Sequence, residues 1–191
     1  MNDRFIDGNV IVLYALYKSS PTRDGLPDHI LSRVRLCLDI HRIIMRSKPD
    51  KNKTAIYIVT NMDSIRNVKD DLLKAGIVEK TMVVDTNSKN LRQTCDSLIK
   101  FIKDRINPPK IYFVGSAWQR EAFDSIVPRK LKGYVVQFDG AIDNRSVVEI
   151  DTENSLDAPK KGIQFYKKQA KEKAANLLLN ILFQNERESR R

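Results

Sequence analysis

The stretch NVIVLYAL at residues 9–16 carries an apolar side chain at every position after Asn9. A stretch of this length that does not alternate with polar residues, and is rich in Val, Ile and Tyr, predicts a strand covered on both faces. Strands of this kind form parallel sheets, whose two faces are packed by helices. Four further stretches share the pattern, at TAIYIVT (54–60), TMVVD (81–85), KIYFVGS (110–116) and GYVVQF (133–138).

Segments with helical spacing separate these stretches. Residues 28–46, 63–76, 90–104 and 117–126 each repeat apolar side chains every three or four positions. Strands that alternate with helices predict right-handed crossover connections, with helices on both sides of a mostly parallel sheet. We therefore expect a three-layer α/β sandwich with a five-stranded or slightly larger sheet, followed by a C-terminal helix over 163–184.

The length and composition are typical of one soluble domain. The chain has 191 residues, of which 41% are hydrophobic and 30% are charged. We expect a single domain over 1–184, with its core at 9–138 and an extension at 139–184, and a frayed basic tail at 185–191. No apolar stretch approaches the roughly 20 residues of a membrane span, and the N-terminus lacks the features of a secretory signal, which predicts a cytoplasmic protein.

The formal charge of +10 is concentrated near the C-terminus. Residues 1–158 carry 25 Lys and Arg against 21 Asp and Glu, whereas residues 159–191 carry 9 against 3. Basic side chains there could neutralise nucleic-acid phosphates or could form the solvated face of an amphipathic helix. The candidate nucleic-acid contacts are Lys160, Lys161, Lys167, Lys168, Lys171 and Lys173.

Polar residues follow each of the first four predicted strands. The segments are YKSSPTRDG (17–25), TNMDS (60–64), DTNSKN (85–90) and GSAWQR (115–120). In an open parallel sheet the ligand crevice lies beyond the carboxyl ends of the strands, where the strand order reverses. Helix N-termini present unpaired N–H groups there, which suit a phosphate or a carboxylate. The same residue types are also preferred helix caps, so each one taken alone has a structural explanation.

Several common catalytic and cofactor motifs are absent. The sequence contains no GxGxxG, no GxxxxGK[ST] and no GxSxG. The two cysteines, Cys37 and Cys95, fit buried small side chains, and no metal site is predicted. Asp63 and Asp85 are the candidate catalytic residues. Burial at the end of a strand is expected to raise the pKa of Asp85, although a structural role as a cap is an equal alternative.

The order of these segments resembles the YdcF-like family of domains of unknown function, which includes the SanA and ElyC envelope proteins. The family has an Arg in the helix after its first strand, a Ser and an Asn after its third, and small residues with an Arg after its fourth. Here LSRVRLCLDI (31–40) supplies Arg33, NSKNLRQT (87–94) supplies Ser88 and Asn90, and VGSAWQREAF (114–123) supplies Ser116 and Arg120. The resemblance covers about residues 9–138.

The chain departs from the family pattern at several positions. Where the family continues Thr-x-Glu-Asn after the third strand, this chain has Leu91, Arg92, Gln93 and Thr94, so an amide replaces the carboxylate. The family His after the fourth strand is replaced by Trp118 or Gln119, and the glycines after the first two strands are missing. The remaining Ser, Asn and Arg residues can still hold an anion.

The resemblance implies a Rossmann-like fold and, because one member is reported to bind it, S-adenosylmethionine as a candidate cofactor. We expect a nucleotide-like or phosphorylated small anionic ligand at the carboxyl edge of the sheet. If the protein is an enzyme, transfer or hydrolysis of a phosphoryl or methyl group is the expected class. Nucleic-acid binding and a purely structural domain are the alternatives. The candidate ligand-binding residues are Arg33, Asn61, Ser88, Asn90, Arg92, Ser116 and Arg120.

Overall fold

A computed structural model of the chain describes residues 8–17, 25–47, 54–105, 107–146 and 150. All of these residues belong to the unit Met1–Asp157. The predicted C-terminal helix, the basic tail and the six candidate nucleic-acid lysines lie outside the described residues. Within the described part of the chain, no helix is both long enough and apolar enough to cross a bilayer.

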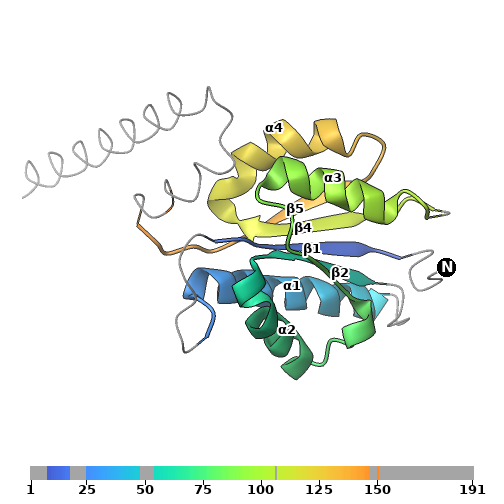
Figure 1. The fold of residues 1–191 in the computed structure, drawn as a ribbon. Coiled ribbons are helices and arrows are strands. Elements are labelled where there is room, and N and C mark those ends of the chain that lie inside the picture. The colour runs from blue at the N-terminus through green and yellow to red at the C-terminus, as the bar shows by residue number, and fades with distance from the viewer. Residues whose placement is uncertain (1–7, 18–24, 48–53, 106, 147–149, 151–191) are drawn as a thin grey trace, which may run out of the picture. The chain divides into compact units, whose positions relative to one another are not determined.

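The centre of the fold is a five-stranded sheet in the order β3-β2-β1-β4-β5. All four neighbouring pairs of strands are parallel, which confirms the predicted α/β architecture of a Rossmann-like three-layer fold (Figure 1). The strands are β1 (Val10–Ala15), β2 (Ala55–Thr60), β3 (Met82–Asp85), β4 (Ile111–Ser116) and β5 (Val136–Ala141).

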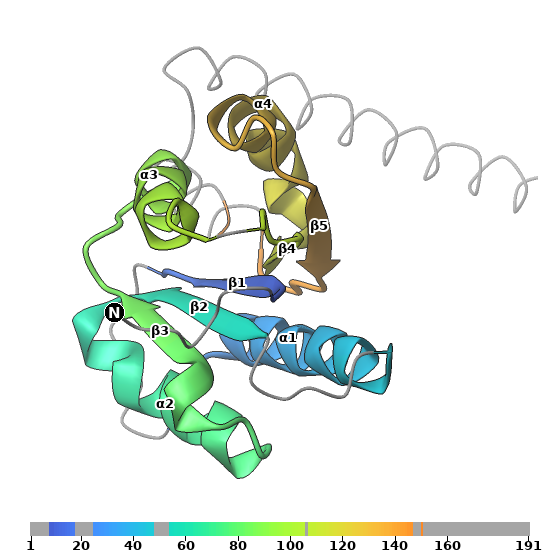
Figure 2. The ribbon, with the colours of Figure 1, turned by 90° about the vertical axis from the view of Figure 1, so that its right-hand side faces the viewer.

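Helices cover both faces of the sheet, as the view in Figure 2 shows most clearly. On one side lie α1 (Asp28–Ser47) and α2 (Ile65–Lys74), and on the other lie α3 (Leu91–Ile102) and α4 (Arg120–Lys130). Within the described residues, short 3-10 helices lie in the connections at η2 (Met62–Ser64), η3 (Glu79–Thr81) and η4 (Ala117–Gln119).

Burial on both faces explains why the sequence of the central strand β1 is apolar without alternation. Because successive side chains of a strand point to opposite faces, Val10 and Val12 pack into the α3 and α4 side, whereas Ile11 and Leu13 pack into the α1 and α2 side. All six side chains of β1 are buried. Each apolar layer therefore takes alternate residues from a strand that has no solvent-facing side.

The last strand differs from its prediction. Apolar residues predict a strand at 133–138, but β5 runs over Val136–Ala141, and Gly133 has a φ of +94° in the turn before it. β5 lies at an edge of the sheet and is only partly buried, so polar residues such as Asp139 are tolerated within it. The strand consequently ends three residues later than the apolar pattern does.

The strand order reverses beside β1. The chain builds β2 and β3 on one side of β1 and then crosses to build β4 and β5 on the other side. In parallel sheets, ligands bind outside the carboxyl ends of the strands at this switch point. In this protein the switch point lies between the ends of β1 and β4, close to Leu16 and Ser116.

Two glycines allow the turn after β4 to pack closely against its surroundings. A Cβ atom on Gly140 of β5 would lie 2.7 Å from the Cα atom of Ala117, and one on Gly115 would lie 2.6 Å from Oε1 of Gln119. Both distances are too short for a side chain. The turn that carries Ser116 is therefore held tightly between β4 and β5.

Candidate functional site

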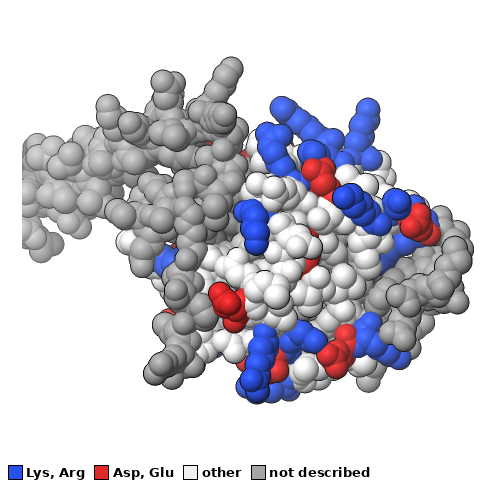
Figure 3. Space-filling model, in the orientation of Figure 1, with Lys and Arg blue, Asp and Glu red and all other residues white. Residues whose placement is uncertain are grey.

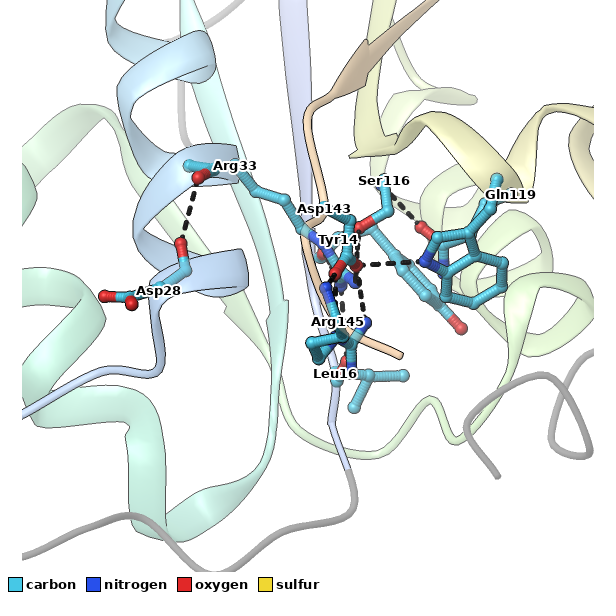
Figure 4. Close-up of polar contacts among 10 residues, drawn as sticks. Tyr14, Leu16, Asp28, Arg33, Ser116, Gln119, Asp143 and Arg145 are labelled. Carbon is cyan, nitrogen blue, oxygen red and sulfur yellow. Dashed lines mark hydrogen bonds and ion pairs between the residues drawn. The ribbon is translucent and has the colours of Figure 1, made fainter. Parts of the chain in front are cut away.

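Arg33 occupies the switch point and is completely buried, with 0% of its surface exposed. It extends from α1 to the end of β1, where Nη1 donates to the carbonyl oxygens of Tyr14 (3.0 Å) and Leu16 (3.4 Å) (Figure 4). Its Nε donates to Oγ of Ser116 at 2.9 Å. Burying a guanidinium costs several kcal/mol unless hydrogen bonds replace the lost water, and these bonds provide that replacement.

Asp143 brings a carboxylate to the same place from the segment that follows β5. Its side chain is only 2% exposed, and its Oδ2 atom lies 3.9 Å from Nη2 of Arg33. The same oxygen accepts hydrogen bonds from Oγ of Ser116 (2.7 Å) and from Nε1 of Trp118 (3.0 Å). Arg145 donates to both carboxylate oxygens, to Oδ1 from Nε at 2.8 Å and to Oδ2 from Nη2 at 2.6 Å.

These contacts decide the ionisation of Asp143. Burial acts to raise its pKa, but the hydrogen bonds from Arg145, Ser116 and Trp118, together with the positive charge of Arg145, act more strongly and hold the pKa well below its usual range. Asp143 is therefore a carboxylate at neutral pH. The site already holds one anion, and that anion belongs to the chain itself.

Ser116 connects the two charged groups. Its hydroxyl accepts from Arg33 and donates to Asp143, so its single proton is directed at the carboxylate. The Ser116 amide donates to Oε1 of Gln119 at 2.8 Å, which closes the turn and fixes the position of the hydroxyl. Both Ser116 and Gln119 are buried. The donors that face Asp143 are thus positioned by a rigid turn.

Asn61 lies beside the same end of β1. Its Nδ2 donates to the carbonyl oxygen of Tyr17 at 2.5 Å, one residue past the Leu16 carbonyl that Arg33 contacts. Of the seven candidate ligand-binding residues, the structure thus places Arg33, Asn61 and Ser116 around the carboxyl end of β1.

The carboxylate of Asp85, in the polar turn after β3, accepts hydrogen bonds from this turn and from β2. Asp85 accepts from the backbone amides of Asn87 (2.9 Å) and Ser88 (3.0 Å), from Oγ of Ser88 (2.5 Å) and from the Tyr57 hydroxyl (3.1 Å). Asn90 caps α3 by accepting from the Gln93 amide at 3.0 Å. Asp85, Ser88 and Asn90 therefore have structural roles, and no described contact joins these three residues to Arg33.

The expected increase in the pKa of Asp85 is wrong. Burial does act in that direction, but the hydrogen bonds from Ser88, Asn87 and Tyr57 outweigh it and lower the pKa below its ordinary value. Asp85 therefore stays ionised, and hydrogen bonds from within its own turn are made to both of its oxygens.

The remaining candidates lie elsewhere on the surface. Arg120 is on α4, across the sheet from α1, and its side chain is 57% exposed. Its guanidinium lies 4.8 Å from the centre of the Phe138 ring and donates to the Phe138 carbonyl. Arg92 and Asp63 are also exposed. The structure consequently does not bring Arg120 or Arg92 to Arg33.

The most informative residues of the site were not among the candidates from the sequence. Asp143 and Arg145 lie in a segment without a helical or strand pattern, and Asp143 meets Ser116 only through a separation of 27 residues in the chain. Gln119 had a detectable signal, because a Gln three residues after a Ser at a helix start matches the capping-box spacing. Trp118, expected from the sequence only as a possible replacement of the family His, donates its indole N–H to Asp143.

One face of the molecule shows no concentration of a single charge among the described residues. On the face drawn in Figure 3, Lys and Arg side chains are mixed with Asp and Glu above and below a largely uncharged middle band. Among the residues that the structure describes, no group of His, Cys, Asp and Glu could hold a metal ion. Cys37 and Cys95 are both buried, as predicted.

Comparisons with known proteins give no relative. No protein-family model matches the chain, and neither the curated proteins nor the solved structures contain a match.

Proposed function

We propose that this chain is a YdcF-like protein that binds a small anionic ligand, nucleotide-like or phosphorylated, at the carboxyl ends of β1 and β4. The observation that carries the proposal is the position of Arg33, a fully buried guanidinium at the point where the strand order reverses. That point is where ligands bind in parallel α/β sheets.

The chemistry of the neighbouring donors supports an anionic guest. A guanidinium presents a fixed fork of N–H groups that matches the oxygens of a carboxylate or a phosphate. Around Arg33, the Ser116 hydroxyl, the Trp118 indole and the Arg145 guanidinium all donate toward one carboxylate oxygen. Such a donor set selects for negatively charged oxygen and offers little to a neutral or cationic group.

The family resemblance adds one specific candidate. S-adenosylmethionine has a carboxylate that would fit these donors, whereas a nucleotide would place a phosphate there. Binding is better supported than catalysis, because the described acid–base candidates do not serve the site. Asp63 is exposed, and Asp85 is ionised and hydrogen-bonded within its own turn. If the protein is an enzyme, phosphoryl or methyl transfer or hydrolysis remains the class to test.

Isothermal titration calorimetry of the full chain with inorganic phosphate, AMP and S-adenosylmethionine tests the proposal. The test variant is the double substitution Arg33→Gln with Asp143→Asn, which removes both buried charges together. The control is Arg35→Gln, the same Arg-to-Gln substitution at an exposed position of the same helix. We expect at least one ligand to bind the wild type, and the double variant to bind it about tenfold or more weakly than Asp143→Asn alone, with the control within about twofold of the wild type.

Two results would reject the proposal. One is that the wild-type chain binds none of the three ligands. The other is that the double variant, with an unchanged circular dichroism spectrum, binds as tightly as Asp143→Asn alone.

A further inference from the structure

The anion-binding donors at the switch point are already in use. The single proton of the Ser116 hydroxyl and the single N–H of the Trp118 indole both point to Oδ2 of Asp143, at 2.7 Å and 3.0 Å. Each of these groups can serve only one strong acceptor at a time. A ligand that uses the same donors must therefore take them from Asp143.

Electrostatics makes the two anions mutually exclusive. A ligand oxygen within hydrogen-bonding distance of Ser116 and Arg33 would lie only a few ångströms from the Asp143 carboxylate, and like charges at such a distance repel strongly away from bulk water. Arg33 has no exposed surface, and Oδ2 of Asp143 lies 3.9 Å from its Nη2 atom. A ligand oxygen that takes the place of Oδ2 beside Arg33 must therefore displace the carboxylate.

The segment that carries Asp143 can move without disturbing the core. Residues 142–146 follow the end of β5, and none of them is a buried apolar residue. Ile142 is 75% exposed, and Asn144 and Ser146 are exposed as well. Asp143 and Arg145 are the inward-facing residues, and Arg145 is hydrogen-bonded to Asp143 itself (Figure 4).

We propose that residues 142–146 are an internal competitor for the ligand: the Asp143 carboxylate occupies the donors of Arg33, Ser116 and Trp118, and the anionic group of the ligand replaces it. This inference rests on the proposed function, since it concerns the same site. It adds that the free protein holds the site closed and that affinity is set by the competition with Asp143.

The test compares the wild type with Asp143→Asn, which keeps the size of the side chain but removes its charge. Asp139→Asn, an equal change of charge on β5, is the matched control. Inorganic phosphate is titrated into the full chain at constant ionic strength, and binding is followed by calorimetry and by the fluorescence of Trp118, the only tryptophan in the chain. We expect Asp143→Asn to bind phosphate about tenfold or more tightly than the wild type, and Asp139→Asn to stay within about twofold.

The possible outcomes separate this inference from the proposed function. One outcome keeps the proposed site and overturns the competition. In it the wild type binds phosphate, the Arg33→Gln and Asp143→Asn double variant does not, and Asp143→Asn alone binds phosphate as tightly as the wild type or more weakly. If no variant binds phosphate, AMP or S-adenosylmethionine, both proposals fall.

A second measurement on the wild type does not depend on how the variant folds. Hydrogen–deuterium exchange of the segment 142–146 is recorded without ligand and with saturating phosphate. Displacement of Asp143 predicts faster exchange of these amides in the presence of phosphate, because the hydrogen bonds that hold the segment are lost. Unchanged or slower exchange with bound phosphate would overturn the competition.

Discussion

Replacing Ser116 with alanine should destabilise the protein far more than the loss of one hydroxyl on the surface would. Ser116 is fully buried and makes two hydrogen bonds to charged partners, accepting from Nε of Arg33 at 2.9 Å and donating to Oδ2 of Asp143 at 2.7 Å. Each hydrogen bond to a charged group contributes about 1.5–3 kcal/mol, and its loss leaves a buried ion less well solvated. Closer approach of Arg33 and Asp143, now 3.9 Å apart, would recover part of the loss.

We therefore expect Ser116→Ala to lower the free energy of unfolding by about 3 kcal/mol. Urea denaturation followed by circular dichroism measures this change, with the slope of the transition as a check that the unfolded state is unaffected. The matched control is Ser125→Ala, which removes an exposed hydroxyl on α4 and should change the free energy by no more than about 0.5 kcal/mol. A loss below about 1 kcal/mol for Ser116→Ala would refute the account of the buried ion pair.

Three further predictions follow from the same structure. Because the pKa of Asp143 is lowered in the folded protein, its contribution to stability is full at neutral pH and is lost as the pH falls below about 4. The free energy of unfolding, measured from pH 6 downward, should therefore depend less steeply on pH in Asp143→Asn than in the wild type. Equal slopes for the two proteins would contradict this prediction. Gly140→Ala should lower the free energy of unfolding by about 1–3 kcal/mol, because the added Cβ would lie 2.7 Å from the backbone of Ala117, and an unchanged melting temperature would show that the turn can move. Cys37 and Cys95 should react with an aromatic disulfide reagent only after unfolding, since both thiols are buried and burial raises the pKa of Cys37 to about 12; rapid labelling of the native protein would disprove it.

The sheet was predictable because its central strands have two buried faces. All residues of β1 and β2 are buried, and this leaves a continuous apolar signal in the sequence. The edge strand β5 has Gln137 and Asp139 facing outward, so its apolar signal is interrupted and its position was misplaced by three residues. The helix predicted over 63–76 ends at Gly76, and α2 ends at Lys74, two residues before this glycine, whose φ of +89° suits the residue that follows a helix.

The site was only partly predictable, and the reason is its long-range assembly. Ser116 was a candidate because it follows a strand whose carboxyl end lies beside that of β1, whereas Arg33, inside the first helix, was a candidate through the family resemblance alone. Asp143 was missed because its partner Ser116 is 27 residues away and nothing in its own neighbourhood marks it. The polar residues after β3 form local contacts instead. Ser88 and Asn90 stabilise the turn and cap the next helix, and a sequence pattern alone does not distinguish such residues from ligand-binding ones.

The most direct test of the anion site is a crystal structure of the full chain grown or soaked with AMP. We expect a phosphate group at the carboxyl ends of β1 and β4, with its oxygens about 3 Å from the Ser116 hydroxyl and the Arg33 guanidinium, and with Asp143 withdrawn from both. AMP bound elsewhere on the molecule, with Asp143 still hydrogen-bonded to Ser116 and Trp118, would contradict it.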